Sequence, residues 1–210
     1  MVKVRNKQAE ALKHMSDKEL LGHLYVSQLL FLLVGVILSF FLFDSWEEFI
    51  SIWTFQPFDI FVIGTIFALV VYFADLLLMK FVPKYMFDDG GINEKMFQRR
   101  TVLHIFFLAF IIALVEEFLF RGVIQTHFGL VAASVIFALM HIRYLSKWLL
   151  LFSVVLLSFL LGLIYEYTGS VLVTFWAHFL IDLLLALKIR HDFINKYVNN
   201  DGGRDNDEQK

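Results

Sequence analysis

The chain has 210 residues, of which 59% are hydrophobic and only 18% are charged, with no cysteine and a net charge of −2. Its mean hydropathy is +0.71, whereas a soluble domain is about 45–50% apolar and about 25% charged. This composition excludes a disordered chain, a disulfide scaffold and a nucleic-acid-binding protein, and the lack of cysteine excludes a thiolate metal site and a thiol nucleophile. The excess of apolar side chains predicts an integral membrane protein.

Apolar runs long enough to cross a membrane recur along the chain. A helix crosses the ~30 Å hydrocarbon core with about 20 mostly apolar residues. The sequence therefore predicts an all-α fold, a polytopic membrane bundle of about six transmembrane helices. The expected spans are residues 24–43, 60–79, 102–124, 128–142, 148–164 and 171–187, of which the fourth is short.

Lysine and arginine are confined to alternate connections between these spans. They occur in the N-terminal arm, after the second span, after the fourth span and in the C-terminal tail, whereas residues 44–59, 125–127 and 166–170 contain none. Every Lys or Arg except Arg121 therefore lies on one side of a six-span arrangement. Because cytoplasmic loops carry the excess of basic residues, we expect both termini to be cytoplasmic and the protein to lie in a bacterial cell membrane.

The spans also divide the chain into parts. These are a cytoplasmic N-terminal arm (1–23), two N-terminal spans with interfacial and basic loops (24–100), a core with all candidate functional residues (101–190) and a polar tail (191–210). The arm lacks the apolar run of a signal peptide. Within the second part, the aromatic segment 45–57 is expected to lie at the membrane interface. Residues 199–210 are expected to be disordered, because they are rich in Gly, Asn and Asp.

Ionisable residues inside the predicted spans are few. Each costs several kcal/mol by most estimates, so each is a functional hypothesis by default. They are Asp75, His104, Glu116, Glu117, Arg121, His141, His178 and Asp182. We expect Asp75 and His104 to be structural, because both lie close to basic loops at the interface.

The spacing of the remaining six residues predicts one shared site. Glu117 and Arg121 are four residues apart, with the Glu N-terminal, which favours an ion pair on one helix face. Glu116 lies about 100° further round the helix and needs another partner. With turns centred on residues 128–129 and 167–169, the residues Glu117, His141 and His178 all lie about 14–18 Å below the turns. Asp182 follows one turn later on the His178 face.

A cluster of Glu, His and Asp allows two hydrolytic chemistries. A carboxylate with an imidazole can position and deprotonate a water molecule. Alternatively, Glu116, His141, His178 and Asp182 could ligate a divalent metal such as Zn²⁺, although no cofactor is certain from the sequence. The structural alternative is a polar network that only ties helices together, and six ionisable groups are more than that purpose requires.

Three ordered motifs resemble those of the CPBP family, which contains type II CAAX prenyl endopeptidases and bacteriocin-processing or immunity (Abi) proteins. The run 116–121 (EEFLFR) matches the motif EExxxR, 137–141 (FALMH) matches FxxxH, and 178–182 (HFLID) matches the third motif, HxxxN or HxxxD. The resemblance covers about residues 101–187 and none of the first two spans.

This resemblance implies an intramembrane endopeptidase with an all-helical core. It implies that Glu116 and His141 activate water and that His178 faces the developing oxyanion, with Glu117 and Arg121 completing the first motif. Asp182 departs from the Asn form, because an ionised Asp cannot donate a hydrogen bond to an oxyanion. Asp182 would then stay protonated, orient His178 or bind a metal.

The expected partners are the lipid bilayer and a membrane peptide or protein substrate, with bacterial peptides favoured over prenylated ones and no nucleic acid. Two other classes stay open at this point. One is a non-catalytic bacteriocin-immunity protein that acts by binding, and the other is an ion-coupled transporter, which the scarcity of polar residues in the other spans disfavours. The sequence does not predict the oligomeric state.

Overall fold

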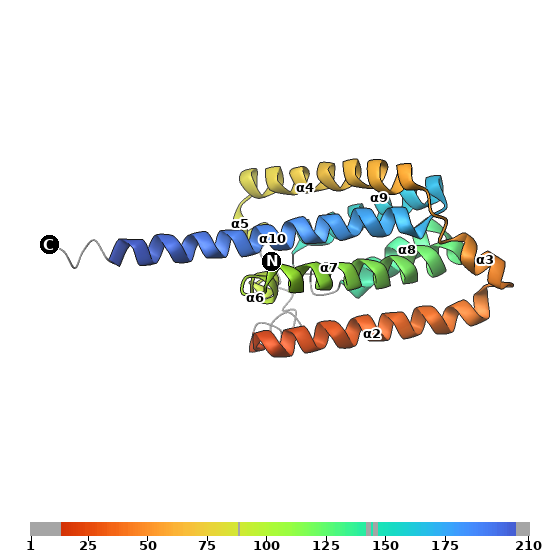
Figure 1. Cartoon of the computed structure of the whole chain (residues 1–210), viewed down its shortest axis with the longest axis horizontal. Coiled ribbons are helices and arrows are strands. Elements are labelled where there is room, and N and C mark those ends of the chain that lie inside the picture. The colour runs from red at the N-terminus through yellow and green to blue at the C-terminus, as the bar shows by residue number, and fades with distance from the viewer. Residues whose placement is uncertain (1–13, 88, 142–143, 145–146, 205–210) are drawn as a thin grey trace, which may run out of the picture.

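The fold is a bundle of helices, seen in a computed structural model that describes residues 14–87, 89–141, 144 and 147–204 (Figure 1). Arm residues 1–13, the predicted span end Ile142, the basic residue Arg143 and tail residues 205–210 lie outside the described part. The elements are α2 (Asp17–Leu42), α3 (Trp46–Ser51), η1 (Asp59–Ile63), α4 (Gly64–Phe81), α5 (Lys84–Phe87), α6 (Ile92–Phe97), α7 (Val102–Glu117), η2 (Phe118–Gln125), α8 (Thr126–Met140), α9 (Trp148–Thr168) and α10 (Val171–Arg204). The predicted all-helical membrane bundle is confirmed, and the described residues contain no strand.

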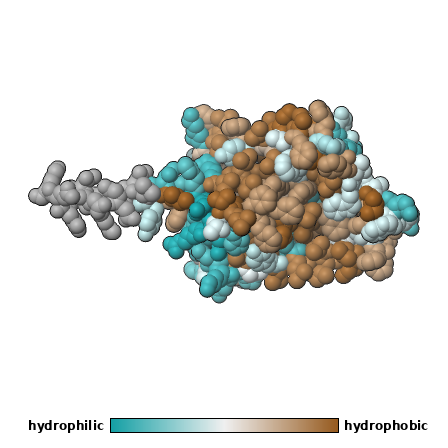
Figure 2. All heavy atoms as spheres, in the orientation of Figure 1, coloured by the Kyte–Doolittle hydropathy of each residue, from teal (hydrophilic) through white to brown (hydrophobic). Residues whose placement is uncertain are grey.

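Five helical runs in the described part are long and apolar enough to cross a membrane, namely Asp17–Leu42, Asp59–Phe81, Val102–Met140, Trp148–Thr168 and Val171–Tyr197. Figure 2 shows the broad apolar surface that they present. Exposed side chains such as Phe40, Phe41 and Leu103 would meet lipid on this surface. The protein is therefore an integral membrane protein with several spans.

The predicted third and fourth spans follow each other without a loop in the run Val102–Met140, which consists of two helical arms joined at a kink. The run is interrupted at Gly129, whose φ of 82° suits a residue without a Cβ. Beyond Gly129 the chain folds back on itself. The contact between Phe120, before Gly129, and Phe137, after it, shows this reversal: their rings meet edge to face with centroids 4.9 Å apart. The second arm, residues 130–140, is about 17 Å long, which is shorter than the hydrocarbon core.

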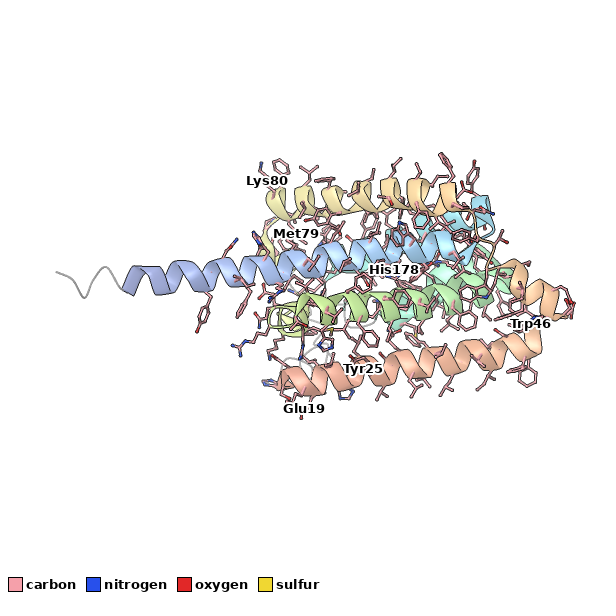
Figure 3. All side chains as sticks on the ribbon, viewed as in Figure 1. Glu19, Tyr25, Trp46, Met79, Lys80 and His178 are labelled. Atoms are coloured by element: carbon pink, nitrogen blue, oxygen red, sulfur yellow. The ribbon has the colours of Figure 1, made fainter. Side chains whose placement is uncertain are left out.

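The two ends of the bundle differ in character. Glu19 and Lys80 lie at one end of the molecule and Trp46 lies at the other (Figure 3). The turn at Gly169, which ends α9 with a φ of 65°, matches the predicted outer turn. The distribution of Lys and Arg predicts that the end with Glu19 and Lys80 faces the cytoplasm.

The predicted interfacial segment 45–57 folds as the short helix α3 and a turn. Ser45 caps this helix by accepting a hydrogen bond from the Glu48 backbone, and Trp46 is exposed. Trp53, in contrast, stacks on Phe118 with centroids 5.7 Å apart. The segment is therefore only partly a surface feature, because one of its indoles packs against the core.

The C-terminal tail departs from the prediction of disorder. Helix α10 continues to Arg204 and is 34 residues long, so residues 199–204 are helical. Contacts four residues apart, Lys188 with Asp192 and Asn195 with His191, support the helix past the end of the apolar run. Gly, Asn and Asp have low helix propensity, but they follow a long helix that is already formed and needs no new nucleus.

Close helix packing positions the functional core. Helices α7 and α10 lie between α2 and α4 in the view of Figure 1, with α8 and α9 behind them. Ala109, Ala113 and Phe179 pack together between α7 and α10. Helix α4 joins α10 through the Trp176 indole, which donates to the Thr65 hydroxyl at 3.0 Å. The polar residues of the third motif are thus held against α7.

The close packing of α9 against residues 102–140 can be tested by a substitution at Gly162. A Cβ at Gly162 would overlap Leu130 Cδ1 and lie 2.8 Å from Gln125 Oε1. We expect Gly162→Ala to reduce the free energy of unfolding by about 1–3 kcal/mol through overpacking, measured as thermal unfolding in detergent. Gly22→Ala is the control, because a Cβ at Gly22 meets nothing within 4 Å. Equal melting temperatures for both variants would contradict the described packing.

Candidate active site

The six predicted site residues come from three segments that are distant in the sequence. Glu116 and Glu117 lie in the last turn of α7, and Arg121 lies in η2 directly after it. His141 ends α8, and His178 and Asp182 lie on α10. The Asp182 carboxyl group interacts electrostatically with His178, Glu116, His141 and Glu117. The structure therefore brings together residues that the sequence predicts to lie at similar depths in the membrane.

Glu117 is fully buried and its carboxylate is saturated by cationic and polar neighbours. Its Oε2 accepts a hydrogen bond from Arg121 Nε at 3.2 Å, and both side chains are 0% exposed. Its Oε1 lies 2.9 Å from His178 Nδ1. The ion pair predicted between Glu117 and Arg121 is confirmed, and it extends to a histidine on another helix.

Arg121 anchors this network to the back of the bundle. Its Nη2 donates to the Ser158 hydroxyl of α9 at 3.2 Å. The guanidinium carbon lies 5.5 Å from the centroid of the Phe137 ring of α8, a distance suited to a cation–π contact. One arginine thus fixes the relative positions of η2, α8 and α9.

His178 bridges two carboxyl groups and lies midway along the bundle (Figure 3). Because a carboxylate only accepts hydrogen bonds, Nδ1 carries the proton shared with Glu117. The other ring nitrogen, Nε2, lies 3.7 Å from Asp182 Oδ2. Nε2 carries a proton as well only when the ring is an imidazolium. The Asp182 side chain is 29% exposed, so the site is more open on its side than around Glu117.

Glu116 has a different environment from its neighbour, as expected from the turn between them. It is buried, with 7% exposure. Its Oε1 accepts a hydrogen bond from the Gln28 amide nitrogen at 3.0 Å, and it interacts electrostatically with His178 and Asp182. Helix α2 therefore contributes a neutral amide to the surroundings of this carboxylate.

His141 is oriented by its own helix. Its Nδ1 lies 2.8 Å from the carbonyl oxygen of Phe137, and its ring contacts those of Phe137 and Tyr144. A carbonyl oxygen only accepts, so Nδ1 carries the proton, and in the neutral ring Nε2 carries the lone pair. His141 is thus oriented to accept a proton at Nε2.

The segment that carries Arg121 is a π-helix, η2. Such wide turns are rare and frequently occur at functional sites. Here the change from α-helix falls directly after Glu117, and all eight residues of η2 are buried. The motif EExxxR therefore spans the transition between two helix types.

The predicted metal set is not assembled as a ligand group in this arrangement. Among the residues that the structure describes, no three His, Cys, Asp or Glu side chains are placed to hold a metal ion. His178 Nδ1 is engaged with Glu117, which leaves Nε2, 3.7 Å from Asp182 Oδ2, as its one possible donor to a metal. These residues therefore do not fit a bound metal as they stand.

Two residues that contact the site, Gln28 and Ser158, are not ionisable and were not predicted. Gln28 is a polar residue within an otherwise apolar span, which is a readable signal. Ser158 carries no such signal, because a serine inside a membrane helix commonly bonds its own backbone. His104 lies outside the site, as expected, and contacts the Tyr25 hydroxyl at 3.1 Å. Asp75 lies on α4, which carries none of the six site residues.

The fold and site define a polytopic helical membrane protein with a buried Glu/His/Asp cluster at the junction of three helical segments. A family profile described as type II CAAX prenyl endopeptidase Rce1-like matches residues 98–184. The uncharacterized protein YpbD of Bacillus subtilis (strain 168) is 44% identical over 171 residues, which cover 81% of this chain and 90% of that protein. The chain belongs to the CPBP family of intramembrane proteases, as its three motifs indicate. No solved structure matches it significantly.

Replacement of Arg121 tests whether its ion pair with Glu117 stabilises the fold. Arg121→Ala leaves Glu117 buried without its ion-pair partner, which typically costs about 3–5 kcal/mol. Glu116→Ala removes one hydrogen bond to a charged group, which costs about 1.5–3 kcal/mol. We therefore expect a lower melting temperature in detergent for Arg121→Ala than for Glu116→Ala. Equal melting temperatures would show that Arg121 and Glu117 do not stabilise the fold as a pair.

Proposed function

We propose that the protein is an intramembrane endopeptidase that hydrolyses a peptide bond in a membrane-associated peptide or protein with water activated by Glu116 and His141. The observation that carries this proposal is the convergence of Glu116, His141, His178 and Asp182, which come from three separate segments, in one cluster. Within it Glu117 is engaged by Arg121 and His178, and Glu116 accepts a hydrogen bond from the neutral amide of Gln28. A carboxylate beside imidazoles can take a proton from a positioned water molecule.

The reaction uses the groups already described. A water molecule beside Glu116 gives one proton to the carboxylate as its oxygen bonds to the scissile carbonyl carbon, and His141 Nε2 orients the water by accepting a hydrogen bond. The carbonyl oxygen becomes an oxyanion. When the C–N bond breaks, the proton on Glu116 passes to the leaving amine nitrogen, so that the carboxylate is restored.

His178 is suited to stabilise the oxyanion. Glu117 holds the proton on Nδ1 and so fixes the ring, and in the imidazolium form Nε2–H can donate to an oxyanion. Such donors act most strongly where water is excluded, and His178 is only 4% exposed. In this role Glu117 and Arg121 hold the histidine, while Asp182 lies at the more open side of the site.

The substrate enters from the membrane plane in this proposal. The matched family profile names CAAX prenyl endopeptidases, whose substrates end in a prenylated CAAX box. The chain aligns over most of its length with a bacterial relative, and we favour bacterial membrane peptides over prenylated proteins. The protein would act in the bacterial cell membrane with both termini in the cytoplasm.

Loss of the water-activating pair is the direct test. Glu116→Ala and His141→Ala should each lower cleavage of internally quenched peptides by at least about 10²-fold, the lower limit for a general acid–base group. The purified protein would be assayed in vesicles with a farnesylated CAAX peptide and an unprenylated peptide library. Glu166→Ala and His23→Ala, at exposed positions, are the controls. Full activity of both site variants would disprove the catalytic role and favour a protein that acts by binding.

Asp182 distinguishes the metal-independent reaction from a metal-dependent one. Asp182→Asn keeps the size of the side chain and supplies an N–H donor, so we expect it to keep or raise cleavage activity. Wild-type activity should also survive strong chelators. A loss of activity that added Zn²⁺ restores would instead identify Asp182 as a metal ligand, because a neutral amide oxygen is a poorer ligand than a carboxylate. A loss without rescue would indicate that Asp182 orients His178.

A further inference from the structure

Gln28 is an unusual residue for its position. It lies inside the apolar run of α2, and it is only 4% exposed, whereas its neighbours Leu29 and Leu30 are 57% and 56% exposed. A buried amide in an apolar environment costs free energy unless its polar atoms are hydrogen-bonded. Its presence at this depth therefore needs a specific reason.

The buried face of α2 consists of Leu20, Gln28 and Gly35. Leu20 packs against Ile92 and Met96 of α6, and a Cβ at Gly35 would lie 2.8 Å from the Phe118 ring. These two positions account for the apolar packing of α2 at either end of the stripe. Gln28, between them, makes the one polar side-chain contact of this stripe, with Glu116.

The Gln28 amide is only half satisfied by the protein. Its Nε2 donates to Glu116 Oε1 at 3.0 Å, but its own Oε1 is buried without a protein partner among the described residues. A residue that served only to tie two helices would gain more from an amide bonded at both atoms. The contact is therefore better explained by what it does for the carboxylate.

We propose that Gln28 is a positioning residue for Glu116, an inference that rests on the proposed function. The Nε2–H donor holds Oε1 and so fixes the orientation of the carboxylate that takes the proton of the attacking water. Because the donor is an uncharged amide, this hydrogen bond orients the carboxylate and adds no positive charge beside it, unlike the bond from Arg121 to Glu117. A base held in one orientation also loses less conformational entropy at the transition state.

This role extends the active site beyond the family motifs. The matched profile covers residues 98–184, and α2 lies wholly outside that range. If Gln28 positions the base, the core alone would be an incomplete enzyme, and α2 would be required for the rate of hydrolysis as well as for packing.

Gln28→Met is the decisive variant, because methionine has a similar length and flexibility but no donor. We expect kcat for the farnesylated CAAX peptide, or for the best peptide of the unprenylated library, to fall about 10- to 100-fold, as for loss of a hydrogen bond to a charged group. KM should stay within about twofold, and the melting temperature should fall no further than in Glu116→Ala, because both variants lose the same hydrogen bond. Leu29→Met, at the neighbouring lipid-facing position, is the matched control and should behave as wild type.

Gln28→Asn provides a second measurement that does not depend on the folding of the first variant. It keeps the amide on a side chain that is one methylene shorter, so kcat should fall less than in Gln28→Met. Unchanged kcat in both variants would overturn the inference. A fall in kcat that follows a fall in melting temperature, with KM changed as well, would also overturn it in favour of a structural tie. Activity retained in Glu116→Ala would instead disprove the proposed function itself.

Discussion

The buried ion pair between Glu117 and Arg121 is the constraint on which the rest of the site depends. Both side chains are 0% exposed, and neither charge could be kept at this depth alone. The pair reaches α10 through His178 and α9 through Ser158. It therefore sets the distances between four helical segments before any reacting group is considered.

The same pair explains how two neighbouring glutamates can differ in role. Because successive residues of a helix point about 100° apart, Glu116 faces other neighbours than Glu117 does. The carboxylate of Glu116 instead faces α2, where it meets an uncharged amide. The division follows from helix geometry together with the polarity of what each face contacts.

Much of this protein follows from the pattern of its residues. The apolar runs, the turns near residues 128–129 and 167–169 and the spacing of Glu117 and Arg121 predicted the bundle, its reversals and the buried pair. They did so because hydrocarbon thickness and helical rise fix where residues lie along a span. Glu117 and His178 were placed at one level by this arithmetic, and their side chains meet at 2.9 Å.

Contacts across the bundle could not be derived in this way, because depth says nothing about which face of a span meets which neighbour. Three contacts depend on how the helices are rotated about their axes. They are Gln28 with Glu116, Ser158 with Arg121, and His178 with Glu117. The π-helix after Glu117 and the continuation of α10 to Arg204 depend likewise on the surrounding structure. The sequence by itself determined the spans, their order and the level of the polar residues, and the tertiary structure alone decided which of those residues touch, because contact requires rotation as well as depth.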